Sequence, residues 1–180
     1  MRLGIDASNI CVGGGINHLK ELLRSLDVGK FNIERIVIWS SKNTLKDLIE
    51  KPWLKKCSEP VFEQNFLLRA IWQHKNLNFE LEKENCDILL VPGGSFTTNF
   101  RPVVTMNQNL IPFELKEIFR YGFSFSTLKF LLLRLSQSNS FKNADGTIFL
   151  SEFSKERVLK ITKSLTGYTT VIPHGITKFP

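Results

Sequence analysis

The stretch that decides the fold is "DASNICVGGGINHL", residues 6–19, which follows the short apolar run at residues 2–5. It holds three consecutive glycines and then apolar residues at the three- and four-residue spacing of a helix. Glycine loses much conformational entropy on folding, so this run implies either a positive φ or a ligand against bare main chain. The pattern predicts a strand, a glycine turn and a helix, and the turn either binds a ligand or packs tightly on its own helix.

The same alternation of apolar runs and helix-period segments continues along the chain and is typical of β-α-β units. Because the apolar runs are continuous, we expect helices to cover the sheet on both faces. The predicted fold is α/β, a Rossmann-like doubly wound and mostly parallel sheet in one domain. The expected strands are residues 2–6, 35–39, 87–91, 102–106, 146–150 and 168–172, with a weaker one near Val61. The expected helices are residues 16–26, 44–50, 67–81 and 151–165, with a region at 114–143 that is broken at Gly122.

Composition is that of a folded globular protein, because 42% of the 180 residues are hydrophobic and 23% are charged. A net charge of +7 favours an anionic partner: nucleic acid, an acidic membrane surface or a phosphorylated small molecule. The basic residues between Lys42 and Lys56 lack the interleaved aromatic pattern of an RNA-binding module, so we interpret them as a solvated face and expect no nucleic-acid partner.

The three cysteines, Cys11, Cys57 and Cys86, are odd in number and lack CxxC spacing. This spacing predicts neither a disulfide framework nor a zinc site, and it fits a reducing cytoplasm. The sequence has no signal-peptide pattern and no membrane-spanning run. The apolar segment at residues 128–135 is interrupted by Lys129 and Arg134 and is interpreted as an amphipathic helix.

Ligands of doubly wound sheets bind beyond the carboxyl ends of the strands, so the loops after the strands hold the candidate sites. Gly13, Gly14 and Gly15 could direct main-chain N–H groups and a helix dipole at a phosphate. The run is a poor dinucleotide fingerprint, because His18 replaces the third glycine and no acidic residue follows the second strand. His18 lies in the first helical turn, where it either faces the same ligand or packs as an ordinary helix residue.

Two later loops carry further candidates. Gly93 and Gly94 follow a buried strand and either approach the ligand or form a plain turn. Asn107, Gln108 and Asn109 are a row of amides that could orient sugar hydroxyls, or else cap the next helix. The nearest carboxylate is Glu114, which has no evident partner that would make it a general base, and the sequence holds no complete catalytic motif. His74 continues an apolar stripe and is predicted to be core or near-core.

Three segments in register resemble the N-terminal domain of GT-B glycosyltransferases, specifically the retaining family called family 4 or group 1. They are "GIDASNICVGGGINHLKELL", "NADGTIFLSEFSKERV" and "TVIPHGI". The resemblance implies a Rossmann-like domain at residues 1–173 and the start of an interdomain hinge at 174–180. It also implies a second domain that binds the nucleotide sugar, to which no part of this sequence corresponds.

The resemblance also implies roles for the candidate residues. The glycine loop with His18 would contact the donor diphosphate and sugar, while the loops at 93–94 and 107–109, with Glu114, would contact the acceptor or the transferred sugar. The interdomain cleft and hinge would include Ser151, Glu152, Ser154, His174 and Gly175. In this family the leaving phosphate, rather than a protein carboxylate, takes the acceptor proton, so the missing carboxylate pair is no objection. We expect no metal and no cofactor, since the nucleotide sugar is a substrate.

The function implied is therefore half of a hexosyltransferase, inactive by itself, acting on a glycan or a lipid-linked acceptor once a donor-binding partner is supplied. We expect it in the cytoplasm, either free or peripheral on the inner face of the membrane. The alternative is a non-catalytic module that binds an acceptor or docks on anionic membrane through residues 123–135, or an inactive truncated fragment.

Overall fold

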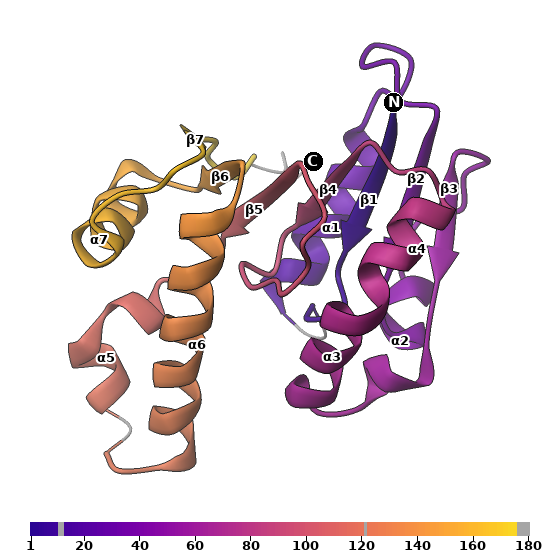
Figure 1. Ribbon diagram of the computed structural model, residues 1–180. Coiled ribbons are helices and arrows are strands. Elements are labelled where there is room, and N and C mark those ends of the chain that lie inside the picture. Colours follow the sequence, from indigo (N-terminus) through magenta and orange to yellow (C-terminus); the bar gives the residue numbers. More distant parts are fainter. Residues whose placement is uncertain (11–12, 121, 176–180) are drawn as a thin grey trace, which may run out of the picture.

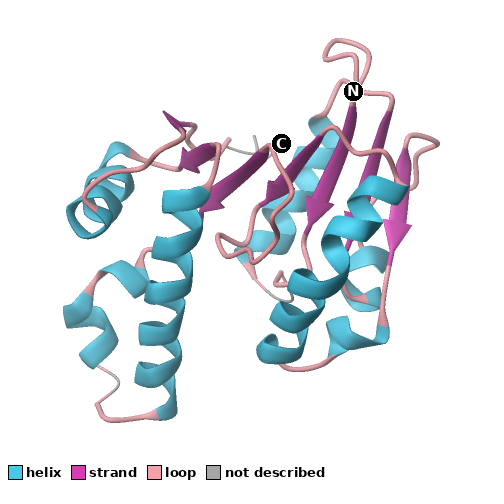
Figure 2. Cartoon of the chain, viewed as in Figure 1, coloured by secondary structure: helices cyan, strands magenta, loops and turns pink. Residues whose placement is uncertain are grey.

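In a computed structural model, the protein forms a single sheet of seven parallel strands with helices packed against it (Figures 1 and 2). The structure describes residues 1–10, 13–120 and 122–175. The strand order is β3-β2-β1-β4-β5-β6-β7. The strands are β1 (Arg2–Asp6), β2 (Arg35–Trp39), β3 (Leu54–Cys57), β4 (Ile88–Val91), β5 (Val103–Asn107), β6 (Gly146–Phe149) and β7 (Tyr168–Val171). The helices are α1 (Gly14–Ser25), α2 (Lys42–Lys46), α3 (Phe66–Trp72), α4 (Asn78–Lys83), α5 (Leu115–Phe119), α6 (Phe125–Asn143) and α7 (Glu152–Thr162).

This architecture confirms the predicted Rossmann-like α/β fold, and all six confidently expected strands are present within one residue of their predicted bounds. The expectation near Val61 was wrong: that residue lies in a short 3-10 helix, η1 (Pro60–Glu63), which begins with a proline. The seventh strand is β3, whose sequence "LKKC" has two lysines in place of an apolar run. It is an edge strand that pairs only with β2, which explains why polar residues are tolerated there.

Alternate residues of β1, β2 and β4 point to opposite faces of the sheet and pack in two separate hydrophobic cores. Ile36 and Ile38 pack against α1 and α2 on one face of the sheet. Val37 and Trp39, their neighbours in β2, pack on the other face with Leu77 and Leu81. This period-2 alternation covers β1, β2 and β4 with helices on both faces, as the continuous apolar runs predicted.

The helix expected at residues 67–81 is present, but its middle is a π-helical segment, η2 (Gln73–Leu77), between α3 and α4. No residue of α3 is buried, and Leu67 and Ile71 are exposed. Within η2, Gln73 and Leu77 face the core while His74 is exposed, so the core prediction for His74 was wrong. The wider turn of a π-helix rotates the residues before it relative to those after it, so one continuous apolar stripe was a wrong interpretation.

The strands β5 to β7 have helices on one face only. Phe149 of β6 packs with Phe113, Phe141 and Val158, from η3 (Ile111–Phe113), α6 and α7. On the other face Val104 and Ile148 are half-buried and Tyr168 is exposed, so the expectation of two covered faces fails for this half among the described residues. The hairpin of α5 and α6 projects beyond the strand ends (Figure 1).

The hairpin turn agrees with the predicted break at Gly122, which has φ of +60°. The side chain of Ser124 then caps α6 by accepting a hydrogen bond from the main chain of Thr127. Over the described part of the chain, no helix is long and apolar enough to cross a membrane.

Candidate ligand-binding cleft

A cleft of about 900 Å³ lies between α3 and α6, beyond the carboxyl ends of β1, β4 and β5. Chain order reverses between β1 and β4, because β1 is followed by β2 on one side while β4 continues the sheet on the other. In open α/β sheets such a switch point is where ligands bind. Its floor contains Asn9, Gly14, Gly15, Gly93, Gln108 and Asn109, so three loops predicted to hold the site converge there.

The glycine turn before α1 leaves main chain accessible to the cleft. Gly13 is the N-cap residue with φ of +80°, a conformation that side chains disfavour, and no side chain caps the helix. A Cβ atom on Gly14 would meet nothing within 4 Å, whereas one on Gly15 would lie 3.2 Å from the Oε1 atom of Gln108. The turn is therefore open at Gly14 and closely packed against the amide loop at Gly15. It leaves room for a ligand at the helix N-terminus.

The second glycine turn follows β4 and completes the floor of the cleft. Gly94 has φ of +81°, and a Cβ atom there would lie 3.0 Å from Nε2 of Gln137 and 3.2 Å from the carbonyl oxygen of Met106. A glycine is needed at this position for both conformation and space. Gly93, which lines the cleft, lies beside Asn9 of the first loop. Gly94 is therefore required for the shape of the turn, while Gly93 exposes its main chain to the cleft.

The three amide side chains after β5 differ in their positions relative to the cleft. Asn107 is buried, and its Nδ2 atom donates a 3.4 Å hydrogen bond to the carbonyl oxygen of Asn109. Gln108 and Asn109 line the cleft. Asn109 also caps η3, because its Oδ1 atom accepts a 3.0 Å hydrogen bond from the main chain of Ile111. This loop therefore supports the start of η3 and presents two amides to the cleft, while their contact with sugar hydroxyls stays a prediction.

Beneath the floor lies a buried carboxylate that the sequence analysis did not single out. Asp6 ends β1, is 2% exposed and accepts hydrogen bonds from the main chain of Ser8, at 3.0 Å, and from Nε2 of Gln73. Burial raises the pKa of Asp6, against the opposing effect of these hydrogen bonds and of the Arg69 charge. Asp6 therefore holds the loop after β1 in place from below.

Arg69 and Gln73 connect this loop to the helical wall of the cleft. The guanidinium of Arg69 donates a 2.8 Å hydrogen bond to the carbonyl oxygen of Ser8, and both side chains line the cleft. They are four residues apart, so they share one helical face. That spacing was visible in the sequence, but nothing in the sequence indicated that β1 would be their partner.

Other candidates lie outside this cleft. Glu114 forms a 2.7 Å ion pair with Arg157 of α7 and is not among the residues that line the cleft. Ser151 and Ser154 form the capping box of α7, with Glu152 exposed in its first turn. These four residues stabilise one helix and its packing, and none of them borders the floor of the cleft.

The structure brings together two histidines from opposite ends of the chain. The ring centroids of His18 and His174 are 4.7 Å apart in an edge-to-face arrangement. Burial and the neighbouring His174 lower the pKa of His18, which favours its neutral form. Neither histidine lines the cleft. Gly175 is exposed, and the remainder of the expected hinge, residues 176–180, lies outside the described residues, as does Cys11.

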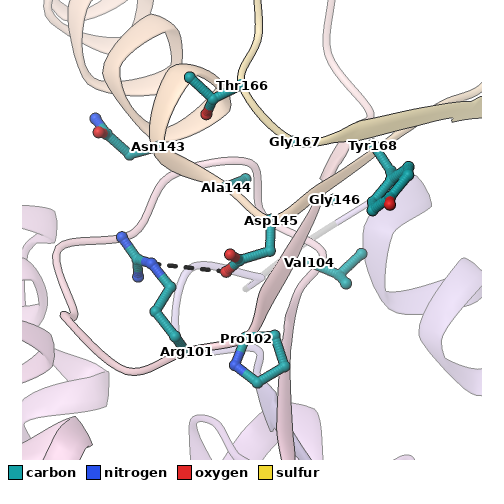
Figure 3. A pocket seen from close by; sticks show the side chains of 10 residues that line it. All are labelled: Arg101, Pro102, Val104, Asn143, Ala144, Asp145, Gly146, Thr166, Gly167 and Tyr168. Atoms are coloured by element: carbon teal, nitrogen blue, oxygen red, sulfur yellow. Dashed lines mark ion pairs between the residues drawn. The ribbon is translucent and has the colours of Figure 1, made fainter.

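The opposite edge of the sheet has a more open hollow of about 730 Å³ (Figure 3). It is formed around the amino ends of β5, β6 and β7, where Arg101 and Asp145 form a 3.6 Å ion pair. Asp145 also accepts a 2.8 Å hydrogen bond from the main chain of Val103, so its carboxylate anchors a strand. Because ligands of parallel sheets bind at the carboxyl ends, we take the first cleft as the functional site.

Reactive groups of other kinds are sparse in the described ranges. No cluster of three or more His, Cys, Asp or Glu side chains there could hold a metal ion. Cys57 and Cys86 are free thiols, and burial raises the pKa of Cys86 to about 11, so it is a poor nucleophile. The cleft itself offers main-chain N–H groups, side-chain amides and the cationic side chains of Arg69 and Lys129.

No known protein family matches this chain, and no curated protein sequence matches it either.

Proposed function

We propose that this chain is the acceptor-side half of a retaining glycosyltransferase, which transfers a sugar from a nucleotide sugar to a hydroxyl of a glycan or lipid-linked acceptor. The observation that carries the proposal is the convergence of two glycine turns and an amide loop on one cleft floor at the switch point of the sheet. A nucleotide-binding half, in the same or a separate chain, completes the site.

The floor suits the two parts of such a donor. Phosphate oxygens fit the N-terminus of α1, where the accessible main chain at Gly14 and the helix dipole both favour negative charge. Sugar hydroxyls need donors and acceptors in fixed positions, and the amides of Gln108 and Asn109 provide both. The close approach of Gly15 to Gln108 ties these two regions into one rigid surface.

In the reaction, the bond between the anomeric carbon and the leaving phosphate oxygen breaks, and a bond to the acceptor oxygen forms on the same face of the sugar. The acceptor proton passes to the leaving phosphate oxygen, so no protein carboxylate is required. The residues of this chain orient the acceptor hydroxyl and hold the sugar, and such positioning lowers the entropic part of the barrier.

A matched pair of glycine variants tests this function. Gly14→Leu enters the cleft at a position where a Cβ atom meets no atom of the described residues within 4 Å, while Gly29→Leu places the same side chain in the turn between α1 and β2. The protein is purified from its own cells with any partner chain and incubated with labelled uridine- and guanosine-diphosphate sugars and a membrane extract. We expect transfer by the wild type and the Gly29 variant, and about a 100-fold loss in the Gly14 variant.

Two results would contradict the proposal. One is the absence of labelled product with every donor, and the other is full activity of the Gly14 variant. If the acceptor binds this cleft but no sugar is transferred, the chain is a non-catalytic acceptor-binding module.

A further inference from the structure

The hairpin of α5 and α6 carries apolar side chains on its outside. Seven large apolar residues between the start of α5 and the middle of α6 are exposed, and we call them the hairpin surface. They are Leu115, Phe119, Phe123, Phe125, Leu128, Leu132 and Leu135. Phe123, next to the turn, is fully exposed. So many neighbouring apolar side chains on a projecting element indicate a binding surface, because single exposed residues are ordinary but clusters are not.

The charges around the hairpin surface are mainly positive. Residues 115–135 contain four basic side chains and one acidic side chain, Glu117, which pairs with Arg120. Lys116 and Lys129 are exposed. Aromatic and leucine side chains flanked by lysine and arginine are the pattern of elements that lie in the interface of an anionic membrane.

The cleft opens toward the same end of the molecule. Phe66 and Leu67, at the start of α3, line one side of its mouth, and Phe125 and Leu132 of α6 line the other. All four side chains are also exposed. The starts of α3 and α6 both point away from the sheet, in the direction of the hairpin turn (Figure 1). The cleft therefore has a polar floor at the strand ends and an apolar mouth next to the hairpin surface.

We propose that the hairpin surface docks this protein on an anionic lipid bilayer, and that the cleft takes the polar head of a membrane lipid whose apolar tail passes between α3 and α6. The docking is independent of the proposed sugar transfer, whereas naming this lipid as the sugar acceptor depends on it. Phe123 and Phe125 enter the bilayer interface, Lys116 and Lys129 meet anionic head groups, and Phe66 and Leu132 contact the lipid tail as it leaves the cleft.

A bilayer fits these features better than a protein partner does. The hairpin surface is carried by a projecting element. It lies next to the exposed Lys116 and Lys129, and lysine is depleted in protein–protein interfaces. A flexible bilayer can enclose a fully exposed phenylalanine beside a turn, whereas a protein partner would need a pocket for it. The continuity of the apolar surface from the hairpin into the cleft also fits a ligand that is itself part of the membrane.

Vesicle flotation tests the docking. The purified protein is mixed with vesicles of phosphatidylcholine alone, or with about 30% phosphatidylglycerol, at low and high salt. We expect binding to the anionic vesicles that weakens with salt. Phe123→Ser with Phe125→Ser should weaken it about tenfold or more, and Lys116→Gln with Lys129→Gln about 30-fold. Lys30→Gln with Phe31→Ser, a matched pair on the exposed turn at the opposite end, should leave it unchanged.

Three outcomes overturn the docking. The wild type does not bind anionic vesicles, the phenylalanine variant binds them as well as the wild type does, or that variant converts a dimeric wild type to a monomer without lipid. The last outcome makes the hairpin surface an interface between copies of this chain. Because the substituted side chains are exposed, thermal unfolding should show that each variant remains folded.

Quenching by brominated lipid tests the orientation of the cleft. Phe123→Trp reports on the hairpin turn, Leu67→Trp on the other side of the cleft mouth, and Phe31→Trp on the far end, after subtraction of the three native tryptophans. Strong quenching of the first two and none of the third is expected. Quenching of Phe123→Trp alone would show docking without a cleft that faces the membrane. None of these readouts requires sugar transfer, so failure here and failure of the proposed function are distinguishable.

Discussion

The two halves of the sheet are built from the same kind of unit but use their apolar residues differently. In the half formed by β1 to β4, the large side chains point into two cores, and Ile5, Trp39, Leu81 and Leu89 are almost completely buried. In the half formed by β5 to β7, one face has little cover and α6 exposes Leu128, Leu132 and Leu135. The first half therefore holds the fold together, while the second leaves apolar side chains exposed on its surface.

The cleft lies where these halves meet. Its floor and its α6 wall differ in how well the elements that carry them are buried. The floor comes from rigid loops attached to the well-buried strands, and the wall formed by α6 comes from the exposed hairpin. A site of this kind keeps its polar contacts in fixed positions while its mouth adapts to a ligand. The following substitutions test that division.

The largest difference in stability should come from a leucine-to-alanine substitution made once in each half of the sheet. Leu81→Ala removes a fully buried side chain and should lower the free energy of unfolding by about 2–5 kcal/mol. Leu132→Ala removes a side chain that is already 44% exposed, so its effect should stay within about 0.5 kcal/mol. Chemical denaturation measures both, and equal losses would show that Leu132 is packed as tightly as a core residue.

A pH series on Asp6→Asn tests the buried carboxylate under the cleft. Since its folded pKa is raised, the native state binds more protons than the unfolded state, and wild-type stability falls as pH rises from about 4 toward that pKa. The melting temperature of the variant relative to the wild type should therefore rise between pH 4 and 7.

Asp47→Asn is the control of opposite sign. Its exposed carboxylate pairs with Lys20, and this hydrogen bond lowers the pKa of Asp47, so the wild type gains stability as pH rises. The Asp47 variant should therefore be the less stable of the pair above about pH 4, and this difference should shrink as pH falls below about 4. If Asp6→Asn is likewise less stable than the wild type except in acid, the hydrogen bonds from Ser8 and Gln73, with the Arg69 charge, outweigh burial.

Two glycines at the cleft should respond in opposite directions to alanine. Gly94→Ala should cost about 1–3 kcal/mol, because its φ is positive and its Cβ would crowd Gln137 and Met106. Gly14→Ala should stabilise by about 0.5–1 kcal/mol, because it starts α1 in open space. Thermal unfolding compares them, and destabilisation at both positions would place Gly14 in a packed turn.

The most local effect concerns the cap of α7 in the second half. Ser151→Ala removes the side chain that accepts a hydrogen bond from the main chain of Ser154 and should cost about 1 kcal/mol. Amide exchange should show this as faster exchange confined to α7. A rise in exchange throughout β1 and β2 would show that the two halves unfold together.

The fold was predictable because buried parallel strands have a strong local signal. Runs such as "RIVIW" and "DILLV" are apolar and β-branched, and the glycine turn marked the first crossover. The edge strand β3 was missed because its partner on one side is solvent, which removes the need for apolar residues. The register of α3 was missed because a π-helical segment changes the exposed face without any residue type that signals it.

The site was predictable only where it consists of loops after strands. The two glycine turns and the amides at Gln108 and Asn109 could be found because the fold itself places such loops at one edge. Asp6, Arg69 and Gln73 could not, because their partnership spans more than 60 residues and depends on how α3 docks over β1. The contact between His18 and His174 could not be predicted either, because it joins residues from opposite ends of the chain.

The π-helical segment Gln73–Leu77 has one further consequence, for how such a protein diverges. A π-helical turn corresponds to one extra residue in an α-helix, so its removal rotates everything before it by about 100°. Deletion of a single residue in this segment would turn Phe66 and Leu67 away from the cleft mouth, yet leave Leu81 in the core. Ligand preference in descendants of this chain can therefore change through one short deletion, while the sheet is inherited intact.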